Sequence, residues 1–166
     1  IHQDELGYGR GLIGQLWALG VIAEIGAFWG MATLTARFGL RTLFLFCFMA
    51  GTIRWAIVAE LSTDLVWLAV AQLLHAATFG IYHAAAVQLV HRLFAPAYRG
   101  RGQGLYSSIG FGLGGGLGSL LAGIAWETMG PYFTWMSAAV VSALGIAVVW
   151  LLVREPQSHQ RATAER

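Results

Sequence analysis

One apolar stretch, residues 65–93, carries several side chains that can do chemistry. Gln72, His75, Phe79, Tyr82 and His83 lie in its middle. Imidazole changes its charge near physiological pH, so a histidine can carry or gate a proton. Glutamine and tyrosine can exchange hydrogen bonds with a solute, and aromatic rings can stack on one. Helical spacing predicts that all of them except His83 share one face, with His83 at its edge.

Two further ionisable residues, Glu24 and Arg54, interrupt other apolar stretches. A carboxylate in such surroundings stays charged only when a cation stands nearby. Arginine keeps its charge, so it needs a carboxylate or a wet cavity. The sequence therefore predicts that Glu24 and Arg54 interact.

These residues could also have purely structural roles or a different chemistry. A Glu–Arg pair can simply clamp two helices, and a histidine can be a hydrogen-bonded core residue. A metal site is disfavoured, because the spacing of His75 and His83 suits no helical ligand pair and the single cysteine, Cys47, adds no third ligand. A hydrolase is disfavoured too, because Ser107 and Ser108 lack a Gly-x-Ser-x-Gly context. The sequence predicts no enzyme.

The composition explains where these groups lie. The chain is 57% hydrophobic and 11% charged, whereas soluble domains are about half apolar and about a quarter charged. A membrane-spanning helix needs about 20 mostly apolar residues. Five stretches qualify, and they predict an all-α membrane protein with spans at about 11–34, 41–60, 65–93, 103–126 and 131–153.

Loop charges predict the orientation of the spans. All ten basic residues are arginines, too scattered for a nucleic-acid surface. One side would carry Arg37, Arg41, Arg92, Arg99, Arg101, Arg154, Arg161 and Arg166. The other would carry Asp4, Glu5, Glu60, Asp64 and Glu127, with Arg10 as its only basic residue. Arginine-rich loops stay cytoplasmic, so the N-terminus is expected outside and the C-terminus inside, in a bacterial cytoplasmic membrane.

Two other features complete the organisation. Residues 1–156 would form one transmembrane half-bundle, and 157–166 a polar cytoplasmic tail. Because the chain opens on Ile1 in a polar segment, we expect it to begin inside a larger protein. The run Gly110–Gly118 offers small residues at spacings of four, which favours either tight helix packing or a mobile helix.

Several stretches resemble the major facilitator superfamily, and most closely its branch of phenylpropionate permeases. They are Trp17–Glu24, Gln72–Phe79 with His83, Arg101–Ser108, and Trp126–Trp135. The loop at Ala32–Arg41 keeps only part of the family's loop motif, because alanines replace its glycine and aspartate. Proton-coupled sugar and nucleoside symporters are similar at a greater distance.

The resemblance implies helices 8 to 12 of a twelve-helix transporter, that is, part of one six-helix half, working by alternating access without a cofactor. Its partners would be the N-terminal half, protons, lipid and a small solute such as an aromatic acid or a sugar-like molecule, taken up by symport. Proton coupling is implied for Glu24, Arg54, His75 and His83. Substrate binding is implied for Trp17, Gln72, Phe79, Tyr82 and Tyr106.

Two other functions remain open from the sequence. The same residues would serve an exporter that works by proton antiport. A membrane protein with a structural or receptor-like role would instead hold Glu24 and Arg54 paired in a dry interior, without an adjoining cavity.

Overall fold

The computed structural model describes residues 2–153, and every regular element in that range is helical. The all-α prediction is therefore confirmed for this part of the chain. The predicted tail at 157–166 lies outside the described residues. The elements are, in order, α1 (His2–Glu5), α2 (Arg10–Glu60), α3 (Leu65–His75), η1 (Ala76–Ile81), α4 (Tyr82–Leu93), η2 (Pro96–Tyr98), α5 (Arg99–Ser107), η3 (Ser108–Gly114) and α6 (Gly115–Leu152).

Three continuous helical stretches are long and apolar enough to cross a membrane: Arg10–Glu60, Leu65–Leu93 and Pro96–Leu152. The first and last are too long for one crossing. At 1.5 Å per residue, a straight α2 would measure about 77 Å, against a hydrocarbon core of about 30 Å. Neither α2 nor α6 is straight, because each contains one residue with non-helical backbone angles.

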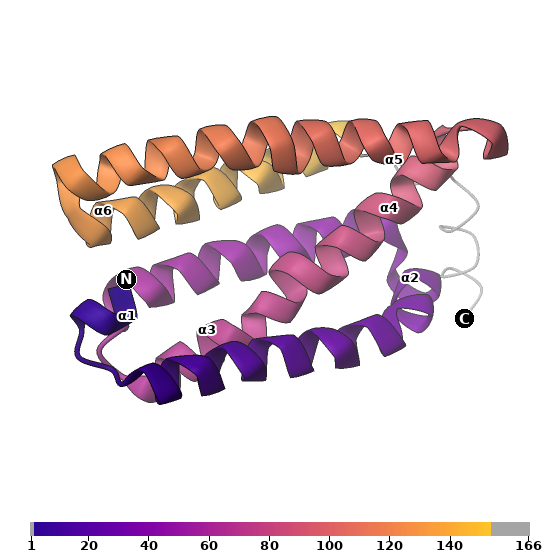
Figure 1. The fold of residues 1–166 in the computed structure, drawn as a ribbon. Helices are drawn as coiled ribbons and strands as arrows, with labels where there is room; N and C mark the ends of the chain where they lie inside the picture. Colours follow the sequence, from indigo (N-terminus) through magenta and orange to yellow (C-terminus); the bar gives the residue numbers. More distant parts are fainter. Residues whose placement is uncertain (1, 154–166) are drawn as a thin grey trace.

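Those two breaks are glycines. Gly39 has φ 74° and ψ 165°, and Gly130 has φ 82° and ψ 174°, a left-handed region that glycine enters without a steric penalty. Figure 1 shows the chain reversing its direction at the middle of α2 and of α6. Both glycines lie inside turns predicted from the sequence. We call 10–38 and 40–60 the first and second limbs of α2, and 115–129 and 131–152 those of α6.

Local chemistry sets the other helix ends. Asp64 begins α3 by accepting a 2.8 Å hydrogen bond from the backbone N–H of Val66, as N-terminal capping residues do. At the other end of this stretch, Phe94 and Ala95 leave the helical conformation just before Pro96, because proline disfavours helix in the residue before it. The predicted third span, 65–93, matches the observed bounds.

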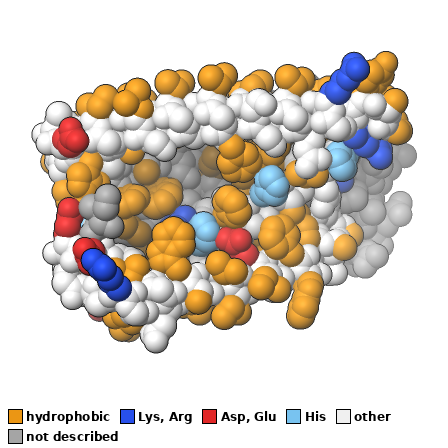
Figure 2. All heavy atoms as spheres, in the orientation of Figure 1, with side chains coloured by type: hydrophobic (Ala, Val, Ile, Leu, Met, Phe, Trp, Pro, Cys, Tyr) orange, Lys and Arg blue, Asp and Glu red, His pale blue; other side chains and the backbone are white. Residues whose placement is uncertain are grey.

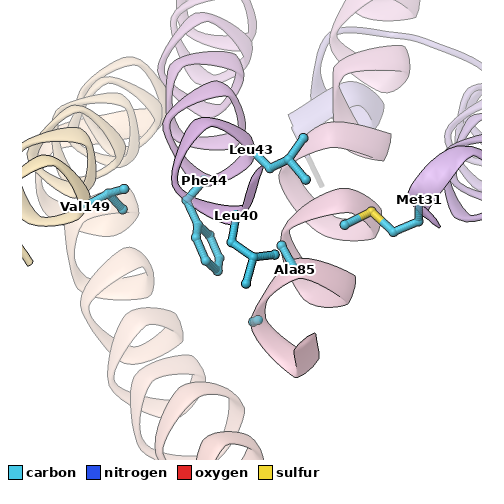
Figure 3. Packing of buried hydrophobic residues seen from close by; sticks show 7 residues of the cluster. Met31, Leu40, Leu43, Phe44, Ala85 and Val149 are labelled. Atoms are coloured by element: carbon cyan, nitrogen blue, oxygen red, sulfur yellow. The ribbon is translucent and has the colours of Figure 1, made fainter. Parts of the chain in front are cut away.

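α2 lies at the centre of the packing, in contact with α3, η1, α4 and α6. One buried cluster joins them, with members from both limbs of α2, from α4 and from the second limb of α6: Met31, Leu40, Leu43, Phe44, Ala85, Ala86 and Val149 (Figure 3). The cluster thus holds the two limbs of α2 and the stretch Leu65–Leu93 to one another. These are the elements that carry Glu24, Arg54 and His75.

Much of the outer surface is apolar. Trp29 is 87% exposed and Leu152 is 75% exposed, which suits contact with lipid far better than contact with water. The Gly110–Gly118 run lies on this surface. At Gly112, Gly116 and Gly118 an added Cβ would meet nothing within 4 Å, so no other part of residues 2–153 packs closely on these glycines, although Phe111 in the same run contacts Phe79 and His83.

Charged side chains gather at the two ends of the bundle. Most acidic groups visible in Figure 2 lie at the end where α1 is drawn, and the blue arginine groups lie mainly at the opposite end. This separation follows the predicted alternation of acidic and arginine-rich loops. In the middle of the same face, a red, a blue and a pale blue side chain lie close together among apolar ones.

Candidate functional site

A π-helical segment, η1, shapes the stretch that carries the histidines. It covers Ala76–Ile81, and its i→i+5 hydrogen bonds make the turn wider than an α-helical one. Consequently the rings of His75, Phe79 and His83 stack in a row. Their centroids are 5.5 Å apart for the first pair and 6.3 Å for the second, with interplanar angles of 13° and 12°. His83 therefore lies on the same helical face as His75, and not at the edge of that face as regular helical spacing predicts.

Two glycines let the first limb of α2 approach this segment closely. A Cβ on Gly20 would lie 3.2 Å from Gln72 Oε1 and 3.5 Å from His75 Cδ2. A Cβ on Gly80 would lie 3.4 Å from Glu24 Cγ. A methyl group would just fit at Gly80 and would press on the Gln72 side chain at Gly20, so side chains larger than alanine at either position would separate the two helices. The close approach brings the Glu24 carboxylate to the His75 ring.

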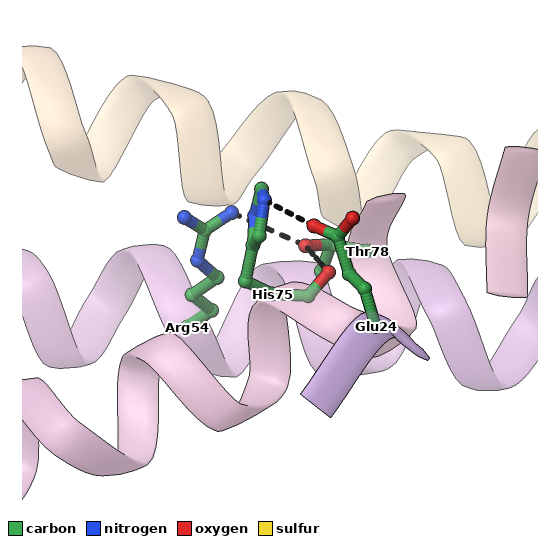
Figure 4. Close-up of polar contacts among 4 residues, drawn as sticks. All are labelled: Glu24, Arg54, His75 and Thr78. Atoms are coloured by element: carbon green, nitrogen blue, oxygen red, sulfur yellow. Dashed lines mark hydrogen bonds and ion pairs between the residues drawn. The ribbon is translucent and has the colours of Figure 1, made fainter. Parts of the chain in front are cut away.

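A short polar network follows from this packing (Figure 4). His75 Nε2 lies 2.7 Å from Glu24 Oε1, and both side chains are largely shielded, with exposed fractions of 28% and 14%. From the second limb of α2, Arg54 Nη1 donates a 3.1 Å hydrogen bond to Thr78 Oγ1. The Thr78 hydroxyl in turn donates to the carbonyl oxygen of His75 at 3.2 Å.

This arrangement differs from the predicted Glu24–Arg54 pair. Within residues 2–153, the ion-pair contact of Glu24 is with His75, while Arg54 contacts a neutral hydroxyl and lies 4.3 Å from the centroid of the Trp55 ring. In the same part of the chain, Arg54 Nε and His75 Nδ1 are shielded from solvent and have no hydrogen-bond partner. Both residues therefore keep unused hydrogen-bonding capacity.

A cavity of about 410 Å³ adjoins the network. Its polar groups come from Arg54, His75, Thr78, Tyr82 and Ser142, and the remaining lining is apolar or aromatic: Cys47, Phe48, Gly51, Trp55 and Phe79. Ligand sites of this kind measure about 300–1,000 Å³ and combine mostly apolar walls with a few polar groups. The cavity can therefore hold a small solute that has both an apolar and a polar part.

The other predicted binding residues lie in different places. Tyr82 lines the cavity and packs edge-on against Phe48, with ring centroids 5.6 Å apart. Tyr106, on α5, has its hydroxyl 3.3 Å from His83 Nδ1. Gln72 packs beside Gly20 and is not part of the cavity wall. Trp17 is 65% exposed and does not line the cavity either.

Sequence reasoning missed several residues of this region. Thr78 links Arg54 to the backbone of His75, Ser142 and Trp55 line the cavity, and Phe111 packs against His83 at 5.7 Å between ring centroids. Thr78 could have been found, because it lies three residues after His75 on the same helix. Ser142 gives no such signal, since a lone serine in an apolar stretch is unremarkable.

Among residues 2–153, no group of three or more His, Cys, Asp or Glu side chains is arranged to hold a metal ion.

Comparison with known proteins identifies the kind of molecule. The chain matches the MFS_1 like family over residues 1–137. It is 32% identical over 144 residues to a protein of Escherichia coli (strain K12) described as a probable 3-phenylpropionic acid transporter. The match covers 84% of this chain and 36% of that relative, so the chain spans about a third of the relative's length. No solved structure matches.

These findings agree with the apolar helices of the structure and confirm the resemblance predicted from the sequence. The relative and the family are transporters and not enzymes, and the long apolar helices are those of an integral membrane protein. The chain therefore belongs to the MFS_1 like family of the major facilitator superfamily.

Proposed function

We propose that the chain is part of a proton-coupled symporter that imports a small aromatic carboxylic acid across the bacterial cytoplasmic membrane by alternating access. The observation that carries the proposal is the 2.7 Å contact between Glu24 and His75 beside a cavity that Arg54 also lines. Ionisable groups in membrane-spanning helices are costly and usually mark a substrate or proton path.

The chain would cross the membrane five times. This proposal is supported by the reversals at Gly39 and Gly130, which divide the continuous stretches Arg10–Glu60 and Pro96–Leu152 into parts that are each long enough to cross. Because the loops of one end carry most of the arginines, that end would be cytoplasmic. The described chain would then begin outside the cell, and its last residues would be cytoplasmic.

Glu24 and His75 are suited to hold a transported proton. With the proton bound, the pair is an imidazolium against a carboxylate, which is a neutral unit. Without it, the negative charge of Glu24 remains beside a neutral imidazole. The two states differ in charge, so they can favour different conformations of the carrier, and a ligand shifts a conformational equilibrium only through such a difference.

Two features favour an aromatic acid over a sugar-like solute. The cavity walls include the rings of Phe48, Trp55 and Phe79 and only a few polar groups, whereas a sugar would need hydrogen bonds for many hydroxyls. In addition, the relative from Escherichia coli is described as a probable transporter of 3-phenylpropionic acid. We take 3-phenylpropionate as the test solute for this reason.

A purely structural role for these charges fits the geometry less well. It predicts Glu24 and Arg54 as a direct pair in a dry interior, whereas Arg54 lies on a cavity wall and contacts Thr78. The direction of transport is proposed from the resemblance to permeases and proton-coupled symporters alone, because a proton antiporter can use the same groups.

The test uses the full-length transporter that contains this chain, reconstituted in lipid vesicles. The initial rate of labelled 3-phenylpropionate uptake is measured with the outside more acidic than the inside, and again without a pH gradient. Protein-free vesicles report the passive entry of the neutral acid. We expect a protein-dependent rate that rises with the gradient and falls when a protonophore is added. A protein-dependent rate that ignores the gradient would refute proton coupling.

A further inference from the structure

Arg54 lacks a carboxylate partner in the part of the chain that the structure describes. Its Nη1 donates to the neutral Thr78 hydroxyl, its Nε has no partner among residues 2–153, and its side chain lies on the cavity wall. Guanidinium is a planar fork that matches a carboxylate with two parallel hydrogen bonds. Arg54 thus presents an unfilled carboxylate-binding geometry beside the cavity.

Counting charges shows when Arg54 needs an anion. With His75 neutral, the charges of Glu24 and Arg54 sum to zero across the network. When a proton joins the Glu24–His75 pair, that pair becomes neutral by itself, and the positive charge of Arg54 is left uncompensated. The protonated cluster therefore carries one net positive charge beside the cavity and attracts one anion.

No other charged group of the described chain faces His75. Glu24 faces it from the first limb of α2, Arg54 lines the same cavity from the second limb, and Tyr82 and Ser142, neutral at physiological pH, come from α4 and α6. The remaining acidic residues of 2–153 lie in or next to loops: Asp4, Glu5, Glu60, Asp64 and Glu127. The cavity itself is thus the place where a balancing negative charge can enter.

We infer that Arg54 binds the carboxylate of the transported acid, and that each carboxylate crosses together with one proton held by Glu24 and His75, so that transport is electroneutral. This inference rests on the proposed function and assigns Arg54 to the solute, although the family resemblance implies a role in proton coupling. In the bound state, the aromatic part of the acid would lie against the rings of Phe79 and Trp55, which line the same cavity.

The first experiment asks whether Arg54 recognises the carboxylate. In vesicles with the full-length transporter, unlabelled 3-phenylpropionate and its neutral amide compete with the labelled acid for uptake. Wild-type protein should prefer the acid by about tenfold to a hundredfold, the range set by a hydrogen-bonded charge. In Arg54→Gln that preference should largely disappear while inhibition by the amide persists, which also shows that the cavity is intact.

Two variants calibrate this result. Arg92→Gln makes the same chemical change at an exposed arginine in the last turn of α4 and should keep the wild-type preference. Arg54→Lys keeps the charge but not the fork, so it should retain an intermediate preference. If Arg54→Gln still prefers the acid as strongly as wild type, Arg54 is balanced by a carboxylate elsewhere in the transporter and the inference is wrong.

The second experiment needs no variant, so it stands even if Arg54→Gln fails to fold. A membrane potential is imposed with potassium and valinomycin at equal pH on both sides. An electroneutral carrier should take up the acid at the same initial rate with and without the potential. A rate that follows the potential would overturn the one-proton, one-carboxylate count.

The outcomes separate the two proposals. Uptake that is absent, or that ignores a pH gradient, contradicts the proposed function itself. Uptake that follows the pH gradient but also follows the potential, or that keeps its acid preference in Arg54→Gln, contradicts only the inference about Arg54.

Discussion

Removing the charge of Glu24 is the perturbation whose effect the structure defines best. Glu24→Gln keeps the shape of the side chain and can still hydrogen-bond the His75 ring, but it no longer balances an imidazolium. The carboxylate oxygen lies 2.7 Å from His75 Nε2, in a pair that is largely shielded from solvent. The variant should therefore fold and bind solute, yet hold a proton poorly.

The size of the effect follows from that contact. A hydrogen bond to a charged group contributes about 1.5–3 kcal/mol, and about 1.4 kcal/mol corresponds to a factor of ten in an equilibrium. The protonated state of the pair should become about 10-fold to 150-fold less populated. If that state carries the solute, acceleration of uptake by external acid should fall by at least about tenfold.

The assay is the initial rate of labelled 3-phenylpropionate uptake into vesicles, with and without an inward proton gradient. Glu5→Gln is the matched control, since it makes the same substitution at an exposed site in α1. It should behave as wild type. If Glu24→Gln protein is accelerated by the gradient as strongly as the control, the Glu24–His75 pair does not hold the transported proton.

Three further predictions concern packing, two of them near the site and one at α1. Gly145→Ala would place a methyl group into the ring of Phe48, and overpacking of this kind typically costs about 1–3 kcal/mol, so the melting temperature in detergent should fall. Tyr106→Phe removes the 3.3 Å hydrogen bond to His83 while keeping the ring; it should lower the free energy of unfolding by about 0.5–1.5 kcal/mol, measured by denaturant unfolding in mixed micelles. Burial lowers the pKa of His2 below its ordinary value of 6.5, so the docked state of α1 favours the neutral ring. Docking of α1 should therefore hold above pH 6.5 and weaken as the pH falls through that value. Hydrogen exchange of the α1 amides measures docking, and an exchange rate that changes with pH no more than the intrinsic rate does would contradict the prediction.

The positions of the helices were predictable because they depend on local chemistry. Apolar length fixes where a chain can cross a membrane, and Gly39 and Gly130 lie in turns that the polar and glycine content of the sequence already marked. The ionisable groups were also identifiable, since a charged residue in an apolar stretch is conspicuous.

The pairing of those groups was not predictable, because it depends on how closely two helices approach. Gly20 and Gly80 bring Glu24 to His75, and neither glycine is conspicuous in a chain that has 22 of them. Likewise, the π-helical turn at Ala76–Ile81 aligns His83 with His75, whereas regular α-helical spacing places it at the edge of that face.

The conspicuous glycine run misleads for a related reason. Gly110–Gly118 has the spacing of a packing face, yet a Cβ at Gly112, Gly116 or Gly118 would meet nothing within 4 Å, and the contact of the run with the histidine stretch is made by Phe111. Small residues permit close approach, but only a partner helix makes use of it.

The central claim is that solute and proton cross together, and the most direct test is to count protons. Full-length transporter is placed in weakly buffered vesicles at neutral pH without a gradient, 3-phenylpropionate is added outside, and external pH and solute uptake are followed together. Protein-free vesicles are subtracted to remove passive entry of the neutral acid. The account predicts that the medium becomes more alkaline by one proton for each solute molecule that the protein carries. Protein-dependent uptake without any proton movement would contradict it.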